Sequence, residues 1–248
     1  MKSLLRRGAV FACLSLCAYI VQGAAVTDSH SYANTDAFRT AHLALDLQAD
    51  FDRKRLAGHV DLTIDRIQQA ARELVLDTRD LSIAKVELLG SRIVPLEYEL
   101  GASDKILGAP LRIRLPERLP SERFKVRVTY ETSPQASGLL WLTPAQTAGK
   151  KHPFLFSQSQ AIHARSWIPL QDTPLIRLTY EARIRTPREL LAVMSAANDP
   201  ETLRDGDYRF EMPQAVPSYL IALAIGDLRF KEIGPRTGVY AEPAVLEA

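Results

Sequence analysis

Apolar and polar residues alternate with a period of two along most of this chain, and this alternation constrains its fold more than any other feature. Residues 43–47 alternate in this way, and after a turn near 52–54 the pattern resumes over 60–64. Successive side chains of a strand point to opposite faces, so the pattern predicts a β-hairpin with one face toward water. The same period recurs over 111–115, 124–132 and 176–184. The sequence therefore predicts an all-β, mostly antiparallel fold, with one large curved sheet or two packed sheets.

One run departs from this alternation. Residues 218–226 (SYLIALAIG) are apolar in both phases. This predicts a strand buried on both faces, although a run of nine residues also fits a buried helix. Prolines fall between the alternating runs, where a missing N–H removes no ladder hydrogen bond. Residues 146–153 are the most loop-like interior segment.

The first 25 residues have the three parts of a secretory signal peptide. Basic residues within 2–7 precede an uncharged run over 9–21, and small residues follow, so we expect cleavage after Gly23 or Ala25. The uncharged run is shorter than the roughly 20 residues that a membrane-spanning helix needs, which disfavours the alternative of a membrane anchor. We expect residues 26–37 to form a loose polar leader, and the protein to be exported to a periplasmic or extracellular location.

Removal of this segment changes the composition of the mature chain. Both cysteines, Cys13 and Cys17, lie in it, so the exported chain is predicted to have no thiol. Three of the 31 basic residues also lie there, which leaves 28 basic against 29 acidic residues. A nearly neutral chain argues against a nucleic-acid partner, and after signal cleavage we expect no membrane partner.

The sequence lacks the local motifs of self-contained catalysis. None of the five histidines is followed by Glu and no two are four residues apart, so no metal site is predicted. The motifs G-x-S-x-G, G-x-x-x-x-G-K-[ST] and G-x-G-x-x-G are missing as well. We therefore predict no catalytic residue and no bound cofactor in this chain.

Residues 154–160 (FLFSQSQ) do not follow the pattern of a solvated strand. On one strand, Phe154 and Phe156 would share a face with the amides of Gln158 and Gln160. An apolar face that ends in two amides fits a strand leaving the core into water. It also fits the wall of a ligand pocket, in which a few amides orient a ligand against an apolar lining.

The next segment, residues 161–174, is predicted to form one helical turn followed by a turn bounded by prolines. Arg165 and Asp172 are placed to pair across it. We interpret this pair as structural, because ion pairs within a fold are more common than ion pairs that serve a site.

These residues resemble a known family. The stretch FSQSQAIHAR (156–165), together with Pro169 and QDTP (171–174), is similar to the N-terminal domain of zinc aminopeptidases of the leukotriene A4 hydrolase and aminopeptidase N family, closest to the former branch. The resemblance spans about residues 36–242. Further segments agree in order: LTY (178–180), LAVMSA (191–196), VPSYLIALAIG (216–226) and IGPRT (233–237).

The resemblance implies a saddle-like β-domain over 38–242 that caps a separate catalytic domain, with residues 243–248 at the start of a linker. In the family, the catalytic domain binds zinc through H-E-x-x-H and has a G-x-M-E-N strand, and neither motif occurs in this chain. Gln160 matches the family position whose side-chain oxygen accepts from the α-ammonium group of the substrate, and Gln158 matches a neighbouring glutamine.

Two functions follow. The first is the substrate-pocket and cap domain of an exported zinc aminopeptidase, present here as a truncated or partial product that is inactive alone. Peptide substrate would then bind only together with a catalytic domain, which a separate chain could supply. The second is a non-catalytic β-saddle module that docks a protein partner or self-associates.

Overall fold

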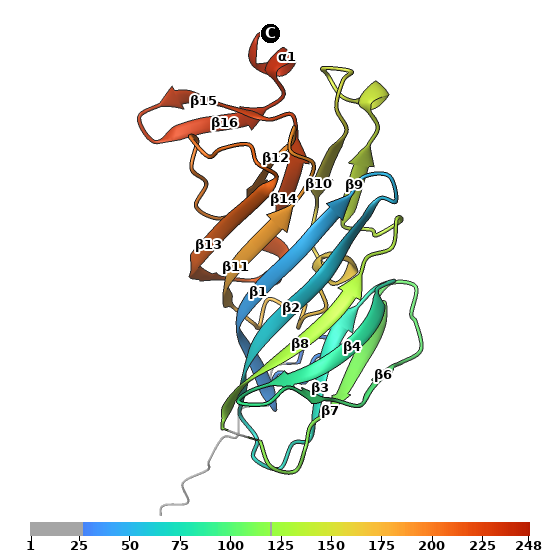
Figure 1. The fold of residues 1–248 in the computed structure, drawn as a ribbon. Helices are drawn as coiled ribbons and strands as arrows, with labels where there is room; N and C mark the ends of the chain where they lie inside the picture. Colours follow the sequence, from blue (N-terminus) through green and yellow to red (C-terminus); the bar gives the residue numbers. More distant parts are fainter. Residues whose placement is uncertain (1–26, 120) are drawn as a thin grey trace, which may run out of the picture.

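The computed structural model describes residues 27–119 and 121–248. Within these residues the chain forms four β-sheets, three single-turn 3-10 helices and one short α-helix. Figure 1 shows the largest sheet running across the molecule, with smaller sheets beside its two ends. The predicted all-β, mostly antiparallel fold is confirmed.

The largest sheet in the described part has seven strands in the order β13-β11-β1-β2-β8-β4-β5. Its strands are β1 (Phe38–Asp50), β2 (Arg55–Arg66), β4 (Ser82–Leu89), β5 (Val94–Pro95), β8 (Arg123–Glu131), β11 (Leu178–Arg185) and β13 (Asp207–Val216). The predicted hairpin of residues 43–64 is β1 and β2, paired antiparallel. β1 also pairs with β11, and that pairing is parallel.

Three smaller sheets complete the described fold. The four-stranded sheet has the order β12-β14-β10-β9, the three-stranded sheet β3-β7-β6, and the last is the hairpin β15-β16. Their strands are β9 (Leu139–Leu142), β10 (Phe154–Ser157), β12 (Leu191–Met194), β14 (Leu223–Gly226), β3 (Glu73–Thr78), β6 (Tyr98–Leu100), β7 (Ala109–Arg114), β15 (Arg229–Gly234) and β16 (Thr237–Ala241). The helices are η1 (Pro144–Gln146), η2 (Ala164–Ser166), η3 (Ser218–Leu220) and α1 (Pro243–Leu246).

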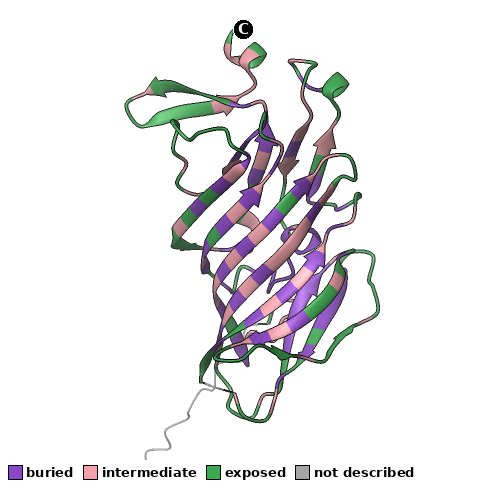
Figure 2. Ribbon diagram, in the orientation of Figure 1, coloured by how far each residue is buried: buried purple, intermediate pink, exposed green. Residues whose placement is uncertain are grey.

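The core lies on one face of the seven-stranded sheet. Every second residue is buried there from Leu43 to Ala49 of β1 and from Val60 to Ile64 of β2, as the alternation predicts, and Figure 2 shows the resulting stripes along these strands. Leu74 and Leu76 of β3 and Leu155 of β10 belong to the same cluster, although they come from the smaller sheets. The three- and four-stranded sheets therefore cover the apolar face of the large one, and the other face of the large sheet meets water.

Two local predictions need correction. Residues 218–226 are not one strand, because Pro217 opens η3 over Ser218–Leu220 and β14 begins only at Leu223. Residues 28–34 are not a loose leader, because they make hydrogen bonds with the body of the domain.

The predicted signal peptide, residues 1–25, lies outside the described residues. Within the described part, no helix has the length and apolar character that crossing a membrane requires.

Candidate functional site

The two glutamines singled out in the sequence lie on a turn directly after β10. The strand ends at Ser157, but the alternation of burial continues past it, because Leu155 and Ser159 are buried while Phe156 is half-buried. Both glutamines are exposed. The backbone N–H of Gln158 donates to the carbonyl of Gly138 at 2.9 Å, and its side-chain oxygen accepts from the N–H of Gln160 at 3.0 Å. The Gln158 amide thus braces the turn, and the Gln160 amide extends from it.

Ser159, two residues after the end of β10, has its side chain in the core. It is buried, and its hydroxyl donates to the carbonyl of Ile221 at 2.8 Å and accepts from the indole N–H of Trp167 at 3.2 Å. Its carbonyl accepts from the N–H of His163 at 2.9 Å. One buried serine between two exposed glutamines therefore fixes the turn at three points.

The segment after the turn is held by a buried ion pair, as predicted. Arg165 and Asp172 are fully buried and their Nε and Oδ2 atoms lie 3.0 Å apart. A second carboxylate that sequence analysis did not predict belongs to this cluster: Asp77, whose Oδ1 lies 3.6 Å from Arg165 Nη1. Burial raises the pKa of Asp77, while Arg165 and the hydrogen-bond donors around the carboxylate act in the opposite direction.

His163 stands at the edge of this cluster. Its Nδ1 lies 2.9 Å from the Ser137 hydroxyl and 3.1 Å from Arg79 Nη1. Partial burial, followed by the Arg79 charge, lowers the pKa of His163. Nδ1 therefore acts as an acceptor on a neutral ring at pH 7.

The four-stranded sheet next to the turn has an apolar outer face. Phe156 pairs with Leu140 on one side and Ala224 on the other, and Val193 pairs with Ala224. Leu140 is 42% exposed, and the other three are half-buried. We call Leu140, Phe156, Ala224 and Val193 the outer apolar row. The row crosses all four strands of the sheet, from β9 through β10 and β14 to β12.

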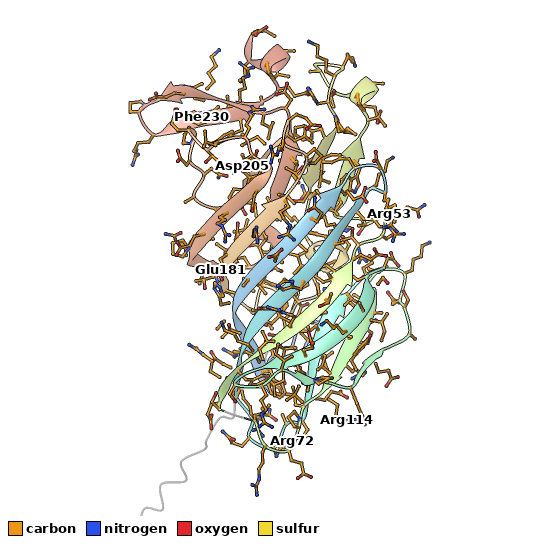
Figure 3. All side chains as sticks on the ribbon, in the orientation of Figure 1. Arg53, Arg72, Arg114, Glu181, Asp205 and Phe230 are labelled. Carbon is orange, nitrogen blue, oxygen red and sulfur yellow. The ribbon has the colours of Figure 1, made fainter. Side chains whose placement is uncertain are left out.

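A hollow of the described part lies away from the turn, on the solvent face of the seven-stranded sheet. It encloses about 590 Å³ above Ala44, and acidic and basic side chains such as Glu181 and Arg209 line it. Figure 3 shows Glu181 on this face. Two of its lining residues form a cross-strand ion pair, in which Arg183 Nη1 lies 4.0 Å from Asp46 Oδ2. Its lining includes neither glutamine of the turn.

Among residues 27–119 and 121–248, no group of three or more His, Cys, Asp or Glu side chains is placed to hold a metal ion. The charged clusters of this part are ion pairs, as in Arg165–Asp172.

The fold and the site together define a class of protein: an all-β saddle-like domain whose small apolar sheet ends in a polar turn. Residues 31–220 match the family model of the peptidase M1 N-terminal domain. The chain belongs to this family, and the resemblance predicted from the sequence is confirmed.

Curated relatives agree with this assignment. The chain is 41% identical to leukotriene A-4 hydrolase of Xenopus laevis over 228 residues, which cover 90% of this chain and 37% of that protein. It is 39% identical to leucine aminopeptidase 2 of Pyricularia oryzae over 224 residues, or 88% of this chain and 36% of that protein. The chain thus spans little more than a third of the length of these relatives.

Solved structures show the same fold. Yeast LTA4 hydrolase in complex with bestatin superposes with a TM-score of 0.80 at 32% identity, over 90% of this chain and 34% of that one. An M1 zinc metallopeptidase from Deinococcus radiodurans superposes with a TM-score of 0.62 at 22% identity, over 84% of this chain and 47% of that one. The second likeness is one of fold alone.

Proposed function

We propose that this domain caps the catalytic domain of a zinc aminopeptidase and contributes Gln160 and Gln158 to its substrate pocket. The observation that carries the proposal is the outer apolar row, which leads along β10 to the exposed glutamine turn. A domain docked on that row would bring its own pocket beside the turn. Because the chain belongs to the M1 peptidase family, we take the docked domain to be a peptidase domain.

The proposed role of Gln160 follows from hydrogen-bonding capacity. The α-ammonium group of a peptide has three donors and no acceptor, so its pocket must offer oxygen atoms. The Gln160 side chain makes no hydrogen bond with the residues that the structure describes, and its amide oxygen is free to accept. Gln158 already accepts from the N–H of Gln160, so its contribution is smaller.

Zinc belongs to the proposed catalytic domain, and no step of the reaction is assigned to a metal held by this chain. We propose that the chain alone is inactive. We also propose that it is exported after cleavage behind Gly23 or Ala25, which N-terminal sequencing of the exported protein would check.

The decisive experiment joins this domain, through Glu242, to the catalytic domain of a relative such as yeast LTA4 hydrolase. Gln160→Ala should lower kcat/KM for an aminoacyl substrate roughly ten- to hundred-fold, because the ammonium group loses one acceptor. Gln158→Ala should cost less, and Gln214→Ala, on the exposed part of β13, should cost nothing. Full kcat/KM in Gln160→Ala with an intact fold would refute the role of Gln160.

The outer apolar row also supports the second candidate, a non-catalytic module that docks another protein. The two candidates differ when the separate catalytic domain is added in trans. A complex with activity that depends on Gln160 supports the first candidate. Failure to bind the catalytic domain, with self-association through the same row, supports the second.

A further inference from the structure

The segment before the first strand is bound to the domain by charged groups. We call residues 28–34 the N-terminal strap. The carbonyl of His30 accepts from Arg165 Nη2 at 2.8 Å. The Ser31 hydroxyl donates to Asp77 Oδ2 at 2.6 Å, and the N–H of Tyr32 donates to Asp77 Oδ1 at 2.7 Å. Three consecutive strap residues thus meet the buried ion cluster.

The far end of the strap is fixed as well. The Asn34 side chain donates to the carbonyl of Glu73 at 2.7 Å and accepts from the N–H of Val75 at 3.0 Å. One amide side chain thus pairs with the backbone of β3 as a neighbouring strand would. The strap therefore has a defined place along β3, next to Asp77 on the same strand.

The groups that the strap meets have no access to water. The side chains of Asp77 and Arg165 are both 0% exposed. Asp77 accepts from only one further backbone donor in the described part, the N–H of Asp172 at 2.9 Å. Without the strap, the carboxylate would lose two of its three hydrogen bonds, and an unmet charge in this position is costly.

Two paths of contacts lead from this cluster to the glutamine turn. Arg165 belongs to η2, the helix that follows His163, and the N–H of His163 donates to the carbonyl of Ser159. On the other path, the Ser218 hydroxyl donates to Asp172 Oδ1 at 2.6 Å. Ser218 begins η3, and Ile221 at the end of η3 accepts from the Ser159 hydroxyl. Both paths end at the serine that lies between the two glutamines.

We propose that the N-terminal strap positions the Gln158–Gln160 turn, through Asp77 and the Arg165–Asp172 pair. N-terminal processing that leaves residues 28–34 in place keeps the turn ordered, and trimming past Tyr32 releases it. The proposal rests on the proposed function only in treating this turn as part of a substrate pocket. The strap's effect on the turn is measurable without any peptidase activity.

The test compares a chain of residues 26–248 with one of residues 33–248 by hydrogen exchange and mass spectrometry. Removal of the strap should speed exchange of the 158–172 segment roughly ten-fold or more, because opening of that segment no longer breaks bonds to charged groups. Residues 38–66, which form β1 and β2, should change much less. Equal exchange of the 158–172 segment in both chains would overturn the proposal. So would an equal acceleration in both regions, which would make the strap a general stabiliser.

A point variant keeps the test valid if the shortened chain does not fold. Ser31→Ala removes the hydroxyl that donates to Asp77 and should speed exchange of the 158–172 segment several-fold. Ser31→Thr retains a hydroxyl and should restore slow exchange. Ser29→Ala is the matched control, because the Ser29 hydroxyl contacts the neighbouring His30 ring at 3.3 Å in an exposed position. Equal exchange in Ser31→Ala and Ser29→Ala would contradict the proposal.

Discussion

At the scale of single residues, Arg165 shows how one buried side chain joins segments that are distant in sequence. Its Nη1 donates to the carbonyl of Leu107 at 2.8 Å, and its Nη2 donates to the carbonyls of His30 and Asp172 at 2.8 and 3.0 Å. The planar guanidinium fork reaches these acceptors in several directions at once, which a lysine ammonium group on a flexible stem does not match. The residue thus ties the strap, the loop before β7 and the turn after η2 to one point.

Arg165→Met is expected to lower the free energy of unfolding by about 3–5 kcal/mol, because it leaves two buried carboxylates without their cation. Urea denaturation followed by circular dichroism measures this change. The control is Arg112→Met, which breaks an exposed pair with Glu73 and should cost about 1 kcal/mol or less. Equal small losses in the free energy of unfolding of the two variants would show that the buried Arg165–Asp172 pair stabilises the fold no more than an exposed pair does.

The lowered pKa of His163 predicts a dependence of stability on pH. The folded state favours the neutral ring, so the unfolded state binds more protons once the pH falls below the ordinary value of 6.5. This stabilisation is present above pH 6.5 and is lost as the pH falls through the lowered pKa of the folded state. Arg79 opposes protonation of the ring, as Arg165 does more weakly, while Asp172 favours it.

The variant that tests this is His163→Asn, whose side-chain oxygen can still accept from Ser137 and Arg79 but does not titrate. The fall in Tm between pH 7.5 and pH 5 should be smaller in this variant than in the unaltered chain. His42 and His59 should contribute to the dependence of Tm on pH that remains in the variant, because burial also lowers their pKa values. An identical slope in both chains would rule out His163 as a contributor.

At the scale of elements, the packing of β10 on β14 depends on one residue without a side chain. A Cβ atom at Gly226 would lie 2.3 Å from Cδ2 of Phe154, so the ring lies directly on the glycine. Gly226→Ala should therefore displace the ring and cost about 1–3 kcal/mol. In the double variant with Phe154→Leu, the added cost of the alanine should fall, as a double-mutant cycle in urea would show. Strictly additive effects would mean that the ring does not rest on Gly226.

The elements that sequence predicted well are those that local alternation decides. The β1–β2 hairpin needs only the period of two and a turn, and both are visible within 25 residues. The partner of the buried Ser159 hydroxyl was not predictable in this way, because it is the carbonyl of Ile221, 62 residues away. Asp77 was missed for the same reason, since its contact with Asp172 spans 95 residues. The glutamine roles came from family resemblance, and they stay predictions.

At the scale of the whole molecule, the four-stranded sheet leaves part of its apolar surface exposed. All residues of β9, β10, β12 and β14 are apolar except Ser157. The inner face of this sheet joins the core, while the outer apolar row is partly open to water. Within this sheet, β14 (Leu223–Gly226) is apolar in both phases, as expected of a strand covered on both sides. The structure covers one side of β14, and the proposed catalytic domain would cover the other.

The outer apolar row should therefore make the chain alone associate. Dynamic light scattering at high protein concentration should report species larger than a monomer, and a hydrophobic dye should bind. Leu140→Glu places a charge at the β9 end of the row, next to Phe156, on a residue that is already 42% exposed, so it should reduce both signals without unfolding the domain. Leu203→Glu, on a loop residue that is 81% exposed and outside the row, should leave both signals unchanged. A monomer without dye binding in the unaltered chain would contradict the assignment of the row as a docking surface. If the two substitutions reduced light scattering and dye binding equally, we would infer that general apolar exposure causes the association. Only the Leu140 change lies beside Phe156 and the glutamine turn.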